Sequence, residues 1–291
     1  MAIREPAVAG MFYQAGADAL REQIEACFLD GPGSLPKVNP HGSRRIIGLV
    51  SPHAGFIYSG SIAAWGYHRL ADDGLPDVAV IIGPNHRSYF PAAALSEDKA
   101  WRTPLGDVKA DAGIAQKIAS AYPAAEVHPG THRAEHSLEV QLPFLQYLAR
   151  GTKKNMRIVP VLIGVAARSA SEKDDAEVAG ELGNAIADAI GDEKAIVIAS
   201  TDFTHYESAE SAAGKDSRAI NRILALDEAG LLDIVRVLDI SMCGDLSTAV
   251  AIAACKKLGA TSAEQLAYAN SGDVTGDYDE VVGYASLTIF R

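Results

Sequence analysis

Three short apolar runs in this sequence are each followed within a few residues by a histidine. The runs are rich in Val and Ile and do not alternate with polar residues, which is typical of parallel strands buried on both faces. They are IIGLV (46–50), VAVIIG (78–83) and AIVIAS (195–200), followed by His53, His86 and His205. Because ligands of open α/β sheets bind beyond the carboxyl ends of the strands, we expect these histidines to converge on one site.

Strand and helix patterns alternate along the rest of the chain. Apolar positions at helical spacing predict helices over residues 18–28, 59–71, 111–122, 137–149, 171–190, 213–237 and 246–257, and further strands are predicted over 157–164, 265–270 and 281–290. We expect the fourth helix to break near Pro143 and the 213–237 segment to divide near Asp227. This alternation predicts one α/β sandwich, with residues 1–291 forming a single domain.

Composition excludes several classes of partner. The formal net charge of −11 argues against nucleic acid and against anionic membrane surfaces. No run approaches the roughly 18–20 apolar residues of a membrane span, and the first residues lack the apolar core of a signal peptide. Three scattered cysteines do not make a disulfide framework, so we expect a reduced, cytoplasmic protein. We interpret Cys27 and Cys255, which lie within predicted helices, as structural.

Two of the three histidines share one offset from their strands. His53 and His86 each lie three residues past an apolar run, which packing alone rarely produces, so a shared site is favoured. Cys243 lies just before the helix predicted over 246–257, with Asp245 as the expected N-cap. A helix N-terminus can lower the pKa of a thiol, which favours thiolate formation and metal binding; the alternative is a buried structural cysteine.

His205 lies farther past its strand and has Asp202 three residues before it. A carboxylate in this position can orient the imidazole and fix its tautomer. The same segment could instead begin a helix that Asp202 or Thr201 caps, and the two roles are compatible.

Other polar residues are weaker candidates. His128 and His132 are spaced as helix neighbours of His136, but a Pro-Gly pair interrupts the stretch, so we exclude both as ligands. Glu135 and His136 either anchor a loop to a helix or support the site from behind its ligands. Asp273 either faces the pocket or makes an Asx turn, and the turn is favoured.

Six segments of the chain resemble the diagnostic segments of a known family. They are, in order, REPAVAGMFY, SPHAGFIYSG, IIGPNH, EHSLEVQLPFL, STDFTHY and MCGDLSTAVAI, and the resemblance extends from Arg4 to Phe290. On these segments the chain is identified as a member of the Memo family, whose prokaryotic group is called AmmeMemoRadiSam system protein B. The family is similar in fold to class III extradiol dioxygenases of the LigB type, which implies a three-layer αβα sandwich with a mostly parallel, mixed central sheet.

The resemblance also implies roles for particular residues. LigB-type dioxygenases hold non-haem Fe(II) with two histidines and a carboxylate, and a further histidine serves as acid and base. Carried over by motif, this makes His53, His86 and Cys243 the metal ligands and His205, with Asp202 near it, the acid–base residue. Cys243 in place of the carboxylate makes a softer site, which favours copper, iron or zinc and argues against extradiol ring cleavage.

Three functions stay open at this point. The first is a metal-dependent redox or dioxygenase-like enzyme that holds Fe(II) or copper and acts on an unidentified small molecule or peptide. The second is a non-catalytic binding or scaffold protein that reuses the old pocket, since animal relatives are associated with cell-motility signalling and phosphopeptide binding. The third, which only the group's name implies, is a role beside a radical-SAM partner in an RNA or peptide modification pathway.

Overall fold

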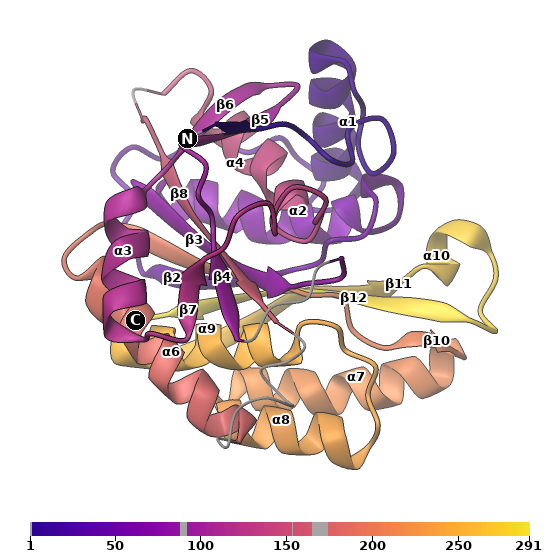
Figure 1. Ribbon diagram of the computed structural model, residues 1–291. Helices are drawn as coiled ribbons and strands as arrows, with labels where there is room; N and C mark the ends of the chain where they lie inside the picture. Colours follow the sequence, from indigo (N-terminus) through magenta and orange to yellow (C-terminus); the bar gives the residue numbers. More distant parts are fainter. Residues whose placement is uncertain (1, 88–91, 153, 165–173) are drawn as a thin grey trace.

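The computed structural model describes residues 2–87, 92–152, 154–164 and 174–291. At its centre four parallel strands lie in the order β8-β3-β9-β2 (Figure 1). Their bounds are Ile46–Ser51 for β2, Val78–Pro84 for β3, Arg157–Ile163 for β8 and Ala195–Ser200 for β9. All four strands match runs that the sequence predicts, and the α/β class is confirmed.

Each central strand packs on both of its faces. In β3, Val78, Val80 and Ile82 contact one hydrophobic core, while Ala79 and Ile81 contact the other. All five side chains are fully buried. Because both faces need apolar side chains, a strand in this position appears in the sequence as a continuous apolar run.

Further strands extend the sheet at both edges and bring it to twelve strands within the described residues. On one side β12 (Val281–Phe290) pairs antiparallel with β2, and both β11 (Ser262–Asn270) and β10 (His205–Glu207) pair antiparallel with β12. On the other side lie β6 (Gly106–Ala110), β5 (Ala100–Thr103) and β1 (Ile3–Arg4), while β4 (Ala93–Leu95) joins β8 to β7 (Ala125–Val127). The sheet is therefore mixed, with a parallel centre.

Helices cover both faces of this sheet and complete an αβα sandwich (Figure 1). One face carries α1 (Ala17–Asp30), α2 (Phe56–Asp73) and α4 (Leu142–Ala149). The other face carries α3 (Ala112–Ala121), α6 (Asp175–Ile190), α7 (Ala209–Leu224), α8 (Glu228–Val237) and α9 (Asp245–Lys257). Two short helices, η1 (Glu139–Gln141) and α10 (Gly272–Thr275), lie in connections. Among the described helices, none combines the length and apolar character that a membrane span requires.

Two predicted helices divide as the sequence indicates. The segment 137–149 begins as the 3₁₀ helix η1 and becomes α-helical in α4, where Pro143 lies in the first turn. A proline is tolerated there because the first N–H groups of a helix have no partner within it. The segment 213–237 divides at Asp227, whose carboxylate caps α8 by accepting a hydrogen bond from the backbone N–H of Gly230.

Several short elements are absent from the sequence-based prediction. The strands β1, β4, β5, β6, β7 and β10 have two to five residues each, too few to establish a period, and their pairing with longer strands makes them extended. The first three residues of the helix predicted over 171–190 lie outside the described residues, and α6 begins at Asp175.

A buried ion pair ties the N-terminal segment to η1. Arg4 Nη1 donates to Glu139 Oε2 over 2.6 Å, and both side chains are almost completely buried. Arg4 Nε donates to the carbonyl oxygen of His132 over 2.7 Å and Nη2 donates to that of Glu135 over 2.6 Å. The guanidinium lies 4.2 Å from the centre of the Trp101 ring. The arginine therefore orders the loop that leads into η1 as well as its own strand.

The carboxylate of Glu139 holds the next residues of the N-terminal segment. It accepts hydrogen bonds from the backbone N–H groups of Ala7 and Val8 and from the hydroxyl of Tyr13. With Arg4, this gives the buried carboxylate four donors, the arrangement that a charge in the protein interior requires.

We predict that Arg4→Met destabilises the protein by about 3–5 kcal/mol, because it leaves the carboxylate of Glu139 buried without its cation. Denaturant unfolding of the two proteins measures this difference. Arg102→Met is the matched control, since Arg102 is 41% exposed where it pairs with Glu5 and Asp107, and its loss should destabilise the protein far less. Equal losses in the two variants would contradict the prediction.

Candidate metal centre

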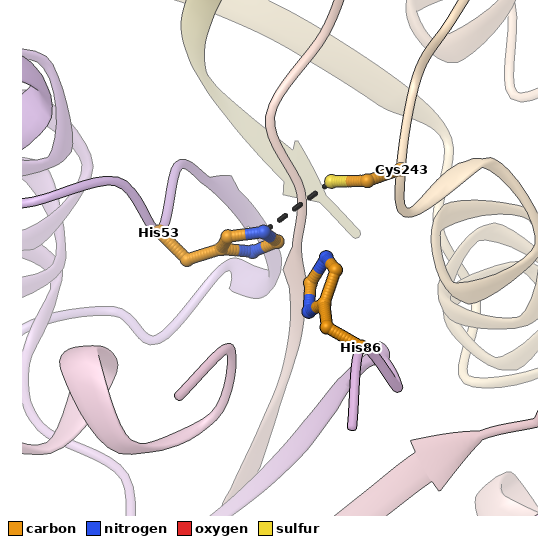
Figure 2. A group of neighbouring side chains, drawn as sticks. All are labelled: His53, His86 and Cys243. Carbon is orange, nitrogen blue, oxygen red and sulfur yellow. Dashed lines mark hydrogen bonds between the residues drawn. The ribbon is translucent and has the colours of Figure 1, made fainter. Parts of the chain in front are cut away.

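Three adjacent strand ends build the site. The sheet order places β9 between β2 and β3, so the carboxyl ends of these strands lie side by side. His53 follows β2, His86 follows β3, and Cys243 lies in the turn that precedes α9. Figure 2 shows the two imidazoles and the thiol directed toward one another from these three segments.

The three side chains each offer a ligand atom within 4.8 Å of the other two. Cys243 Sγ lies 3.3 Å from His53 Nε2, and the rings of His53 and His86 meet edge to face with their centres 5.4 Å apart. His53 is buried, whereas the side chain of His86 is 32% exposed. The structure thus brings together all three residues that the sequence suggests as ligands.

Burial sets the protonation states of His53 and Cys243. It lowers the pKa of His53 well below its usual range, and the neighbouring imidazoles of His136 and His86 lower it further, so the ring is neutral. Burial also raises the pKa of the Cys243 thiol, and the charge of Asp202 adds to this effect. The pKa of this thiol is thus raised where the sequence predicts that the helix N-terminus lowers it, because loss of hydration is the largest effect.

Glu135 fixes both the backbone and the ring of His86 by hydrogen bonds. Its Oε2 accepts a hydrogen bond from the backbone N–H of His86 over 2.5 Å, and its Oε1 lies 3.0 Å from Nδ1 of the same residue. The backbone N–H groups of His136 and Ser137 also donate to Oε1. Burial alone would raise the pKa of Glu135, but the contacts with His86 hold it far below its usual value. The ionised carboxylate accepts from Nδ1–H and leaves Nε2 of His86 as the ligand atom.

His136 belongs to the site more closely than the sequence indicates. Its ring stacks on that of His86 with centres 4.8 Å apart, lies 5.4 Å from that of His53 and contacts Phe12 at 4.7 Å. Burial lowers the pKa of His136 to about 4. Glu135, His136 and His86 also form a group of ligand atoms, but four N–H groups already occupy the Glu135 carboxylate. The group that contains Cys243 is therefore the better candidate of the two for a metal site.

Asp202 lies against His53, but it does not form the expected pair with His205, and His205 is not among the grouped ligand atoms. Asp202 Oδ1 accepts from the backbone N–H of His53 over 2.8 Å, and its Oδ2 lies 3.9 Å from His53 Nε2. Burial raises the pKa of Asp202 to about 6. Ser241 provides the partners of His205 instead, because its carbonyl accepts from Nδ1 over 2.8 Å and its hydroxyl accepts from the backbone N–H.

The helix start considered for this segment is also wrong. His205 lies in β10, and α7 begins at Ala209 with Ser208 as its N-cap. The hydroxyl of Thr201 accepts from the backbone N–H of Gly244 and so holds the Cys243 turn against the end of β9. Pairing of β10 with β12 keeps the segment extended.

The expected roles of Asp245 and Asp273 also differ from what the structure shows. The N-cap of α9 is Gly244, and Asp245 is the first helical residue, with its Oδ1 accepting from the backbone N–H of Leu246. Asp273 is exposed on α10, where its carboxylate accepts from Asn270 N and Tyr278 OH. Asp273 thus holds the connection between β11 and β12 through contacts other than those of an Asx turn, and it is not among the grouped ligand atoms.

Sequence reasoning misses the residues that hold His53. Its Nδ1 lies 3.1 Å from the hydroxyl of Ser200, the last residue of β9, and Ser200 contacts Gln141 and the carbonyl of Ser137. The available signal is a polar residue at the end of an apolar strand and a second one inside the segment EHSLEVQLPFL. Neither is informative until the fold brings them together.

A cavity of about 220 Å³ lies beside the ligands. It is lined by Pro84, Asn85, His86, Ile163, Gly164, Cys243, Asp245, Leu246 and Ser247. Because His86 and Cys243 form part of its wall, a small molecule or a side chain in the cavity can reach these two candidate ligands.

Known proteins similar to this chain identify its family. The family model described as Memo-like protein matches residues 4–288. This chain belongs to the Memo family. A MEMO1 family protein of Methanopyrus kandleri is 46% identical, with 99% of each chain covered. One of Methanothermobacter thermautotrophicus is 44% identical over 98% of this chain and 100% of its own length.

A solved structure supports the fold of this Memo protein independently. The crystal structure of an uncharacterized protein from Escherichia coli K12 matches with a TM-score of 0.54, covering 84% of this chain and 100% of that chain. Sequence identity is only 14%, so the likeness concerns the fold alone.

The burial of His132, which the sequence excludes as a ligand, should make the free energy of unfolding depend on pH. It is buried against Trp101, and burial lowers its pKa to about 3 from an ordinary value near 6.5. The unfolded chain binds a proton at His132 below pH 6.5, while the folded protein does not until about pH 3. The contribution of His132 to the stability of the folded protein is therefore fully present above pH 6.5. It is lost as the pH falls from 6.5 toward 3.

We expect the free energy of unfolding of wild type to fall by about 1.4 kcal/mol more per pH unit than that of His132→Phe between pH 6 and 4. Denaturant unfolding at a series of pH values measures both slopes. His41→Gln removes an exposed histidine and should keep the wild-type slope. A wild-type slope in His132→Phe would show that His132 titrates normally in the folded protein.

Proposed function

We propose that this Memo protein binds one redox-active metal ion through His53, His86 and Cys243 and uses it to oxidise or reduce a small substrate. The observation that carries the proposal is the convergence of three ligand atoms, from three separate segments, to within 4.8 Å of one another. Two imidazole nitrogens and a cysteine sulfur at this spacing are a set of ligand atoms that suits a transition-metal ion.

The donor set restricts the metal. Imidazole nitrogen suits copper, iron and zinc, and a cysteine sulfur favours soft or borderline ions over magnesium or calcium. Three protein ligands leave positions open for substrate, as in catalytic metal sites. Copper or Fe(II) would supply electron transfer at this place, whereas zinc would supply only Lewis-acid chemistry.

The surrounding residues perform the tasks that such chemistry needs. Glu135 presents Nε2 of His86 to the metal, and Asp202 fixes the backbone of His53. His205 keeps Nε2 as a proton acceptor, because its Nδ1–H is held by the carbonyl of Ser241. His136, stacked against His86, is the second imidazole that can exchange a proton there. The cavity beside His86 and Cys243 receives the substrate.

Metal analysis of freshly purified protein tests the ligand set. Wild type should contain stoichiometric iron or copper, and His53→Ala, His86→Ala and Cys243→Ala should each lose most of it, because two ligands cannot replace three. His128→Ala is the matched control, since His128 lies outside the grouped ligand atoms, and it should retain the metal. Full occupancy in Cys243→Ala would remove the thiolate from the site. A metal-free wild type that also fails to take up copper or iron would favour a non-catalytic binding protein.

The role of His205 is tested separately. We predict that His205→Ala keeps the metal, with at most the roughly 10- to 100-fold loss of affinity typical of residues that support a ligand. Any redox activity should fall further than affinity, because the proton acceptor is lost. Metal affinity by competition with a chelator, together with dioxygen consumption, measures the two effects. Loss of metal as complete as in His53→Ala would make His205 a ligand.

A further inference from the structure

We propose that Ser200 and Gln141 are positioning residues that lock the neutral ring of His53 in the tautomer with its proton on Nδ1. The lock leaves the lone pair of Nε2 directed at the metal position. Its consequence for metal affinity rests on the proposed function, whereas the tautomer itself is a property of the metal-free protein.

The contacts of Gln141 orient its side-chain amide without ambiguity. Its Nε2 lies 2.9 Å from the carbonyl oxygen of Pro52, and a carbonyl only accepts hydrogen bonds. The nitrogen of the amide must therefore be on this side, and Oε1 accepts from the hydroxyl of Tyr67 over 2.7 Å. The second hydrogen of Nε2 then points to the Ser200 hydroxyl, 2.8 Å away.

Ser200 has only one hydrogen to donate. Its hydroxyl lies 2.6 Å from the carbonyl oxygen of Ser137, which again can only accept, so the hydrogen is used there. Toward His53 Nδ1, at 3.1 Å, the hydroxyl oxygen can therefore only accept. A neutral imidazole has one N–H, and this contact requires it to be on Nδ1.

The other ring nitrogen is consequently an acceptor. Nε2 of His53 faces Cys243 Sγ at 3.3 Å, where a thiol can donate to it in the metal-free protein and a metal ion can take its place. A proton on Nε2 would instead oppose a metal ion and leave two acceptors, Nδ1 and the Ser200 oxygen, facing each other in the interior. A buried pair of acceptors with no hydrogen between them is strongly unfavourable, and this fixes the tautomer.

The rings of the two histidine ligands thus have different kinds of hydrogen-bond partner. The carboxylate of Glu135 fixes the ring of the partly exposed His86, while neutral groups fix the ring of the buried His53. All the side chains of the neutral relay, Ser200, Gln141 and Tyr67, are almost completely buried. The ring of His53 is therefore held by uncharged hydrogen-bond partners, while the buried carboxylate of Asp202 accepts from its backbone N–H.

Nitrogen-15 NMR of histidine-labelled, metal-free protein tests the lock directly. Long-range proton–nitrogen correlations distinguish the two tautomers, and His53→Gln assigns the signal. We expect His53 to show a protonated Nδ1 and an unprotonated Nε2. The opposite tautomer, or an equal mixture, in wild type would overturn the proposal without any variant having to fold.

Three variants then connect the tautomer to its cause. Ser200→Ala removes the acceptor and should shift His53 toward the Nε2–H form, with metal affinity about 10- to 100-fold weaker. Ser200→Thr keeps the hydroxyl and should therefore show the wild-type tautomer of His53 and the wild-type metal affinity. Ser286→Ala removes another fully buried serine hydroxyl, on β12, and should change neither. An unchanged tautomer in folded Ser200→Ala would overturn the role of Ser200.

The two proposals fail in different ways. If wild type binds no copper or iron but shows the Nδ1–H tautomer, the proposed function is wrong and the lock stands. If wild type binds metal through His53 but its metal-free form shows the Nε2–H tautomer, the lock is wrong and the metal site stands.

Discussion

The residues behind the metal ligands are governed by one constraint, which is that a polar atom removed from water needs a partner inside the protein. Ser200, Gln141, Glu135 and Glu139 are all nearly inaccessible to solvent. Each is satisfied by groups with a fixed direction of donation, such as carbonyl oxygens and backbone N–H groups. Because these directions cannot be reversed, the orientation of the ligands in front of them is also fixed.

The same constraint links the N-terminal segment to the site. Arg4 donates to Glu139 and to the carbonyl of Glu135, while the side chain of Glu135 accepts from His86. The segment that follows Arg4 brings Phe12 against His136. The first residues of the chain are therefore part of the wall of the site, although they contribute no ligand atom.

Burial explains why the protonation states differ from those of the free side chains. Loss of hydration penalises every charged form, so His53, His136 and His132 stay neutral and the Cys243 thiol keeps its proton. Glu135 keeps its charge at the site, because its hydrogen bonds with His86 outweigh its desolvation. A metal ion bound here would reverse the balance at Cys243, since a coordinating sulfur gives up its proton.

The sequence by itself determined the central strands, the principal helices and the two histidines that follow strand ends, because these depend on period and position along the chain. Long family segments also pointed to Cys243. Only the tertiary structure decided how the supporting residues act. It placed β9 between β2 and β3, which brought Ser200 to Nδ1 of His53, and it turned Asp202 toward His53 and Ser241 toward His205. These choices depend on contacts between residues more than thirty positions apart, and local sequence patterns carry no information about such pairing.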